Sequence, residues 1–197
     1  NPDYISIMEK IERLRTKILI EKYKGTRRLN LHTVYISGPT ATGKPRYVLD
    51  THRDINVYRV TDYKHPFDHY SNEPVLCFDE FRSQIRLSEM LVYTDIYPIQ
   101  LPARYANTYA CYETVYIVSN WSLESQFTDA QETSPESWNA FLRRIHEVRI
   151  FNVDGTVTIY DSVEKYLKRN EEFHTIDSDI KPPFEETKEN EVHTNEQ

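Results

Sequence analysis

The sequence predicts an α/β fold in which a mainly parallel sheet is covered by helices on both faces. Three observations support this prediction. Short runs of β-branched and apolar residues alternate with helical patterns along the chain. A glycine-containing loop at 38–44 joins one such run to a helical pattern, and another run, at 74–79, ends in two adjacent carboxylates. Loops and charges at strand ends are where open α/β sheets bind ligands.

The N-terminal segment is predicted to be a helix of about 20 residues, because Asn1 can cap it and Pro2 suits its first turn. Its apolar residues recur at intervals of three and four, at Tyr4, Ile7, Ile11, Leu14 and Ile18. This heptad-like stripe leaves two interpretations open. The helix either packs on its own domain or contacts another copy of the chain.

Six strands and four further helices are predicted from the periodicity of apolar residues. The predicted strands are 33–37, 55–60, 74–79, 114–120, 147–152 and 156–160, the last forming a hairpin with its predecessor across Asp154-Gly155. The predicted helices are 43–50, 83–93, 135–145 and 162–172, with Ser134-Pro135 and an Asp161–Glu164 capping box marking two of their starts. Residues 97–120 interrupt the alternation and are expected to form a long hairpin whose tip carries Arg104, Tyr105 and Asn107.

Composition is that of an ordinary globular chain, with 197 residues, 39% of them hydrophobic, and a net charge of −7. The charge is uneven: twelve Lys/Arg and six Asp/Glu lie within residues 1–60, whereas residues 161–197 carry five and eleven. We expect residues 173–197 to be an acidic, disordered tail. No apolar run is long enough to span a bilayer, so no membrane partner is expected. Cys77 and Cys111 lie in apolar runs and are expected to be buried thiols.

The loop Gly38-x-x-x-x-Gly43-Lys44 has the pattern of a phosphate-binding loop. Glycines allow the backbone to curl so that its N–H groups point at phosphate oxygens, and the following helix adds positive potential. The expected nucleotide-binding residues are Gly38, Pro39, Thr40, Ala41, Thr42, Gly43, Lys44 and Pro45. Lys44 is expected to contact the terminal phosphates of ATP.

Three further groups are candidates for the chemistry of such a site. Asp79 and Glu80 end the strand at 74–79, where Asp79 suits a Mg²⁺ ion and Glu80 suits polarising an attacking water. Asn120 ends another apolar strand, and an amide there can hold a water against the γ-phosphate. Arg143 and Arg144 precede a strand and are either surface charges or an arginine finger for a neighbouring subunit.

The order of these motifs (GPTATGK, VLCFDEF, a basic hairpin, YIVSN and LRRI) resembles the superfamily 3 helicase domain of Rep replication initiators. Those initiators come from circular single-stranded DNA viruses, such as circoviruses, and from related bacterial rolling-circle plasmids. The resemblance spans about residues 34 to 151 and includes the spacing from Tyr97 to Asn120. Each motif alone has low specificity, but the combination is specific.

The resemblance implies an AAA+-type ATPase that forms a hexameric ring and translocates on single-stranded DNA. It implies a helical oligomerisation segment at 1–32, an ATPase domain at 33–172 and a hairpin that grips DNA through Arg104 and Tyr105. It also favours the intermolecular interpretation of the N-terminal helix. Members carry a His-x-His nuclease domain before the helicase; no His-x-His occurs here, so we expect that domain to be missing from this chain.

Two residues depart from the family pattern. Pro45 stands where a Ser or Thr is usual, and proline offers neither a hydroxyl ligand for Mg²⁺ nor an N–H for phosphate. Ala41 stands where glycine is frequent. We therefore expect weaker nucleotide binding or slower turnover on an unchanged fold. Two alternatives remain open: an ATP-gated DNA-binding oligomer with impaired hydrolysis, and the RNA helicase of a positive-strand RNA virus.

Overall fold

The computed structural model describes residues 2–104 and 108–169. The chain divides into two units, Asn1–Tyr166 and Leu167–Gln197. Of the second unit only residues 167–169 are described, and they are helical. The predicted acidic tail at 173–197 and the predicted hairpin residues Tyr105 and Asn107 lie outside the described residues. Everything below concerns the first unit.

The predicted sheet is present, with six strands in the order β2-β3-β6-β1-β7-β8. The strands are β1 (His32–Ser37), β2 (Val57–Val60), β3 (Val75–Phe78), β6 (Thr114–Val118), β7 (Glu147–Phe151) and β8 (Val157–Tyr160). The first five are parallel, and β8 runs antiparallel to β7 as the predicted hairpin. All six predicted strands are therefore confirmed. β2 starts two residues later than predicted because Asp54–Asn56 form a 3-10 turn.

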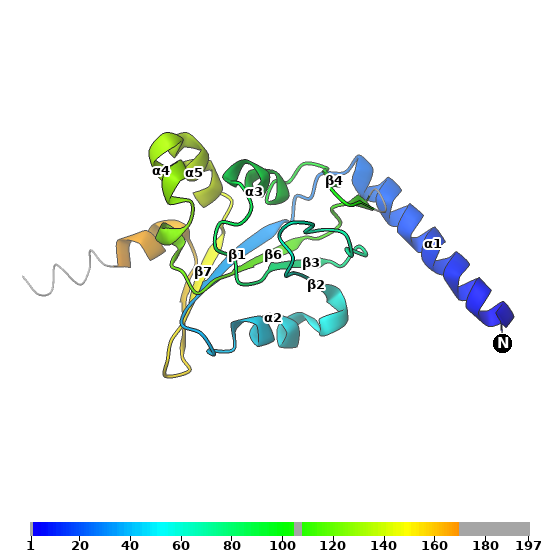
Figure 1. Cartoon of the computed structure of the whole chain (residues 1–197), viewed down its shortest axis with the longest axis horizontal. Coiled ribbons are helices and arrows are strands. Elements are labelled where there is room, and N and C mark those ends of the chain that lie inside the picture. The colour runs from blue at the N-terminus through cyan, green and yellow to red at the C-terminus, as the bar shows by residue number, and fades with distance from the viewer. Residues whose placement is uncertain (1, 105–107, 170–197) are drawn as a thin grey trace, which may run out of the picture. The chain divides into compact units, whose positions relative to one another are not determined.

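Helices cover both faces of this sheet, as predicted (Figure 1). The labelled helices are α1 (Pro2–Lys24), α2 (Lys44–His52), α3 (Leu87–Tyr93), α4 (Thr128–Thr133) and α5 (Pro135–Leu142), with a 3-10 turn at Leu123–Ser125. Residues 163–166, the part of the predicted helix 162–172 that belongs to the first unit, are helical as well. α2 lies on one face, and α3, α4 and α5 lie on the other. Since side chains of a strand alternate between faces, Val34 and Ile36 pack on the α2 side, while Tyr35 joins the larger core under α3 and α5.

Two local predictions were wrong, and one short helix was not predicted. The helix predicted at 83–93 begins only at Leu87, because Ser83 has a left-handed backbone (φ 58°) that a helix cannot contain. α4 was not predicted, since its sequence TDAQET has no apolar period. The predicted cap at Asp161 is instead Ser162, whose hydroxyl accepts the N–H of Lys165.

The long hairpin predicted for 97–120 is much shorter in the structure. β4 (Gln100–Leu101) pairs antiparallel with β5 (Thr108–Tyr109), and β6 belongs to the main sheet instead. The chain reaches β6 through a buried stretch in which Cys111 and Tyr112 pack against the core. Both cysteines are buried free thiols, as predicted, and burial raises their pKa.

Candidate functional site

The loop at 38–44, called the glycine loop below, connects β1 to α2 and needs glycine at two positions. Gly38 has φ 145°, and a Cβ there would lie 2.3 Å from the backbone oxygen of Phe151. Gly43 has φ 82° and caps α2. Both conformations strongly favour glycine. Ala41 is also left-handed, at φ 67°, a conformation that costs an L-residue about 1 kcal/mol. Alanine in place of the more frequent glycine at position 41 therefore lowers the stability of the loop conformation.

Lys44 begins α2, and its side chain turns back into the glycine loop. The residue is only 4% exposed, and its ammonium donates to Gly38 O at 2.7 Å, Pro39 O at 2.6 Å and Asn120 Oδ1 at 2.9 Å. Burial lowers the pKa of Lys44, while the charges of Asp79 and Glu80 act in the opposite direction. The lysine therefore anchors the loop through protein oxygens and stands close to negative charge.

Pro45 occupies the first turn of α2 without disturbing the helix. The first N–H groups of a helix have no partner within it, so proline is tolerated there. The helical hydrogen bond from Tyr47 N–H to Gly43 O, at 2.9 Å, is intact. The expectation that the loop and helix form despite Pro45 agrees with this geometry. What Pro45 removes is one of the donors that point toward the loop.

Asp79 and Glu80 follow β3, beside the glycine loop. Asp79 is 6% exposed; its Oδ2 accepts from Arg59, whereas its Oδ1 is buried without a hydrogen-bond partner among the described residues. Glu80 is exposed and has a left-handed backbone at φ 52°. A buried carboxylate oxygen without a partner is costly unless a cation or water satisfies it. Asp79 therefore has the chemistry of a cation ligand.

A cavity of about 400 Å³ brings these groups together. The glycine loop, Asp79, Glu80 and Asn120 all line it. The strand order explains the arrangement, because β6 lies between β1 and β3 and all three strands run in the same direction. Two backbone hydrogen bonds tie their carboxyl ends: Ser119 N–H to Ile36 O at 2.9 Å, and Phe81 N–H to Val118 O at 2.8 Å.

Arg143 and Arg144 lie at the opposite end of the sheet from the glycine loop. They precede β7, and the backbone N–H of His146 donates to Thr33 O at the start of β1. The loop follows the end of β1, four residues further on, which corresponds to about 13 Å along a strand. Arg144 is paired with Asp95 at 2.6 Å, whereas Arg143 is exposed. The structure therefore does not bring these arginines to the cavity of their own chain.

Arg104, predicted to lie at the hairpin tip, is held by Asp68. Its backbone N–H and its Nε donate to the two carboxylate oxygens at 3.0 and 2.6 Å. These hydrogen bonds, the backbone one first, lower the pKa of Asp68. The sequence offered no sign of this pairing, because 36 residues separate the two side chains.

Sequence reasoning missed two residues that contact Asp79. Arg59 on β2 pairs with its side chain, and the hydroxyl of Tyr63 donates to its backbone oxygen at 2.6 Å. A signal for Arg59 was available, because it is the one charged residue in the predicted strand 55–60. An arginine in a buried strand needs a partner of opposite charge, although the sequence does not say which residue that partner is. Tyr63 gave no such signal.

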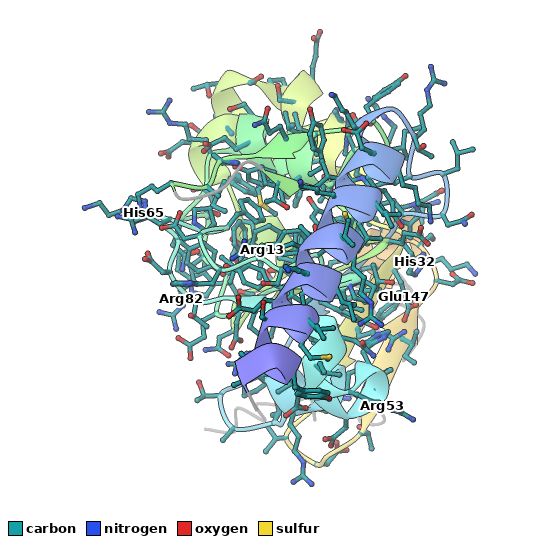
Figure 2. All side chains as sticks on the ribbon, turned by 90° about the vertical axis from the view of Figure 1, so that its right-hand side faces the viewer. Arg13, His32, Arg53, His65, Arg82 and Glu147 are labelled. Atoms are coloured by element: carbon teal, nitrogen blue, oxygen red, sulfur yellow. The ribbon has the colours of Figure 1, made fainter. Side chains whose placement is uncertain are left out.

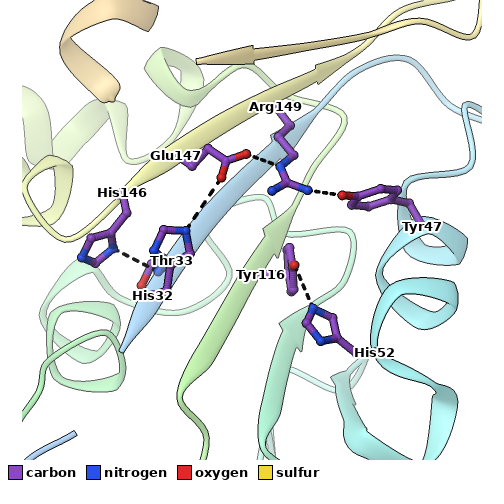
Figure 3. A network of polar contacts seen from close by, with 8 residues as sticks. All are labelled: His32, Thr33, Tyr47, His52, Tyr116, His146, Glu147 and Arg149. Atoms are coloured by element: carbon purple, nitrogen blue, oxygen red, sulfur yellow. Dashed lines mark hydrogen bonds and ion pairs between the residues drawn. The ribbon is translucent and has the colours of Figure 1, made fainter. Parts of the chain in front are cut away.

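A second polar network lies on the α2 face of the sheet (Figure 3). Arg149 on β7 donates to Glu147 and to the hydroxyl of Tyr47 on α2. His52, near the end of α2, contacts the hydroxyl of Tyr116 on β6 at 2.9 Å. Burial and the nearby Arg149 lower the pKa of His52. Together these contacts fix both ends of the helix that begins at Lys44.

Comparisons with known proteins do not identify a family for this chain. No protein-family model matches the chain, and no curated protein matches it significantly. Among residues 2–104 and 108–169, no group of three or more His, Cys, Asp and Glu side chains is placed to hold a metal ion. Over the same residues, each helix is too short or too polar to cross a membrane.

Proposed function

We propose that this chain is an ATP-driven single-stranded DNA translocase, the helicase module of a Rep-type replication initiator of superfamily 3. The observation that carries the proposal is that Lys44, Asp79 and Asn120, which follow three different parallel strands, line one cavity with the glycine loop. Such strand ends are the usual ligand site of open α/β sheets. A cation, an acid pair and an amide around a loop that can bind anions match the needs of phosphoryl transfer.

Each residue then has a separate task. The glycine loop and Lys44 bind the β- and γ-phosphates, which requires the ammonium to exchange a backbone oxygen for phosphate. Asp79 fits a Mg²⁺ ion because its buried Oδ1 needs a positively charged or hydrogen-bonding partner. When bound, Mg²⁺ supplies charge neutralisation for the phosphates. Glu80 polarises the attacking water, and Asn120 orients it against the γ-phosphate.

The proposed site also needs an arginine finger, which its own chain does not supply. Assembly into a ring, a hexamer by family resemblance, would bring one from a neighbouring copy. Arg143 is too far from its own cavity, but it is exposed and can reach the site of a neighbouring copy. Arg144 is paired with Asp95, so Arg143 is the better candidate for the finger. The stripe on α1 supports assembly, because Tyr4, Ile7, Leu14 and Ile18 are all more than half exposed on one helix. Figure 2 shows this helix along its exposed side, with Arg13 on it.

One observation favours the alternative of an ATP-gated assembly that binds DNA but hardly hydrolyses ATP. The ammonium of Lys44 is already satisfied by protein oxygens, and Pro45 offers no N–H to attract phosphate. Both features weaken binding of the terminal phosphates. Turnover therefore separates this alternative from the translocase.

The test is ATP turnover by the full chain with and without oligo(dT). We expect Mg²⁺-dependent hydrolysis that DNA stimulates. Lys44→Ala should abolish it, whereas Glu80→Gln should retain nucleotide binding and lose hydrolysis. Binding of ATP without turnover would favour the gated assembly, and stimulation by oligo(U) but not by oligo(dT) would favour an RNA helicase. No binding of ATP at all would rule out the proposed site.

A further inference from the structure

Residues 59–68, called the connecting segment below, hold Asp79 by three separate contacts. Arg59 pairs with its Oδ2, and the hydroxyl of Tyr63 donates to its backbone oxygen at 2.6 Å. The backbone N–H of Asp79 donates to Val60 O at 3.1 Å. Burial raises the pKa of the Tyr63 phenol, so that hydroxyl stays protonated and remains a donor at neutral pH. The position and orientation of Asp79 therefore depend on the connecting segment.

The other end of the same segment holds Arg104. Asp68 accepts from the backbone N–H and from Nε of Arg104, and its Oδ2 also forms an ion pair with Nη2 at 2.6 Å. Only Oδ2 contacts the guanidinium, while Oδ1 accepts the backbone N–H, so side chain and backbone of Arg104 are both held by one carboxylate. Ten residues thus connect the proposed cation ligand to the proposed DNA-binding arginine.

The connecting segment is braced between these ends. The ring of Phe67 is fully buried and lies 4.8 Å from that of Tyr93, centroid to centroid. The hydroxyl of Tyr58 donates to Pro66 O at 2.9 Å, and the ring of Tyr63 packs 5.9 Å from that of Phe81. Packed aromatic groups of this kind move as a unit, because a close-packed core does not deform continuously.

Tyr63 also lies between two cavities. One, of about 350 Å³, is lined by Arg59, Asp79 and Glu80; the other, of about 370 Å³, is lined by Asp68 and Arg104; and Tyr63 lines both. Figure 2 shows His65 and Arg82, one from the wall of each cavity, along the same edge of the molecule. The space on both sides of Tyr63 allows its ring to shift when either neighbour changes.

We propose that the connecting segment couples the two sites, so that DNA engagement at Arg104 changes how Asp79 is held. This inference rests on the proposed function. A DNA phosphate competes with Asp68 for the guanidinium of Arg104, since both are anions that guanidinium binds in the same geometry. Release of Asp68 frees the end of the segment, and the shift reaches Asp79 through Tyr63 and Arg59. Because coupling is reciprocal, ATP with Mg²⁺ must change DNA affinity by the same factor.

The experiment measures the affinity of the full chain for a fluorescent ATP analogue with Mg²⁺, in the absence and in the presence of saturating oligo(dT). The ratio of the two affinities is the readout. We expect a ratio of at least about fivefold for the parent chain, the lower end of typical coupling. Tyr63→Phe, which removes only the hydroxyl, and Asp68→Asn should each bring the ratio to within about twofold of one. Their double variant should lose no more than the stronger single one, since both act on one path.

Tyr112→Phe is the matched control, because that hydroxyl also donates to a backbone oxygen, Tyr93 O at 2.9 Å, but does not touch Asp79. It should keep the parent ratio, which excludes a general effect of removing a buried hydroxyl. Asp68→Glu, which keeps the carboxylate, should retain part of the affinity ratio that Asp68→Asn loses. A parent ratio of one, or an unchanged ratio in Tyr63→Phe and Asp68→Asn, overturns the coupling and leaves the ATPase in place. A parent chain that binds neither ligand overturns the proposed function as well.

Discussion

The ammonium of Lys44 donates to the side-chain oxygen of Asn120 at 2.9 Å, although 76 residues separate them in the sequence. The contact joins the end of β6 to the start of α2. In the proposed ATPase this contact gives Asn120 two possible effects on ATP turnover: it can orient water, and it can hold Lys44 away from or close to a phosphate.

Substitution of Asn120 by alanine should distinguish these effects. If the amide orients the attacking water, kcat falls by about 10²-fold, as for other lost hydrogen-bond donors in active sites, while ATP affinity changes little. If it only restrains Lys44, affinity rises because the ammonium is freed. Single-turnover and equilibrium-binding measurements separate the two; an unchanged kcat would remove Asn120 from the proposed mechanism.

Pro45 offers a gain-of-function test in two steps. Pro45→Ala restores a backbone N–H at the start of α2, and Pro45→Thr restores the N–H together with a hydroxyl for Mg²⁺. Because a hydrogen bond to a charged group contributes about 1.5–3 kcal/mol, we expect Pro45→Thr to raise kcat/KM by about tenfold or more. Pro45→Ala should account for part of that gain. Equal or lower activity in both variants would show that the site has adapted to proline.

The two glycines of the loop should differ in their tolerance of alanine. At Gly43 an added Cβ meets nothing within 4 Å, so only the backbone strain of about 1 kcal/mol remains. At Gly38 it would lie 2.3 Å from Phe151 O, and β1 or β7 must move. We expect Gly38→Ala to lower the free energy of unfolding by about 2 kcal/mol or more. Urea titration measures the free energy of unfolding of both variants. Equal losses would mean that the backbone at Phe151 moves without cost to make room for the added Cβ.

Stability should also depend on the protonation of His52. Its folded pKa lies below the usual 6.5 because of burial and the charge of Arg149, so the unfolded chain binds the proton more readily. The contribution of His52 is therefore complete above pH 6.5 and is lost as the pH falls through 6.5 toward the folded pKa. His52→Gln should flatten the decline in unfolding free energy between about pH 7 and pH 5. An identical pH profile for parent and variant would contradict this role.

The strands and the glycine loop were predictable because they depend on local rules. β1 is a β-branched run, and Gly38 and Gly43 adopt backbone angles that glycine favours. The approach of Asn120 to Lys44 was also predictable in outline, since parallel strand ends meet at one edge. The pairs Arg59–Asp79 and Asp68–Arg104 could not be predicted. Strand order and loop packing bring these residues together, and local periodicity predicts neither. The hairpin at 97–120 was predicted to be too long for the same reason, because a run of β-type residues does not determine which strand it pairs with.

The position of Arg143 leads to a test that depends on assembly. In one chain Arg143 precedes β7 at the far end of the sheet, so an arginine finger can act only on another copy. Arg143→Ala and Lys44→Ala should each be inactive as pure proteins. When they are mixed in equal amounts, random assembly gives about a quarter of interfaces an intact Lys44 site facing an intact Arg143, and activity should return to that extent.

Arg144→Ala is the matched control, because its partner is Asp95 of the same chain. It should lose stability through that ion pair but keep ATP turnover as a pure protein, because Lys44 and Arg143 are both intact. Light scattering must show that the mixed proteins form joint assemblies, and Leu14→Asp, on the exposed stripe of α1, should reduce their mass. Joint assemblies without any recovery of ATP turnover would exclude a finger at Arg143. Recovery that survives Leu14→Asp in monomeric protein would exclude action between subunits.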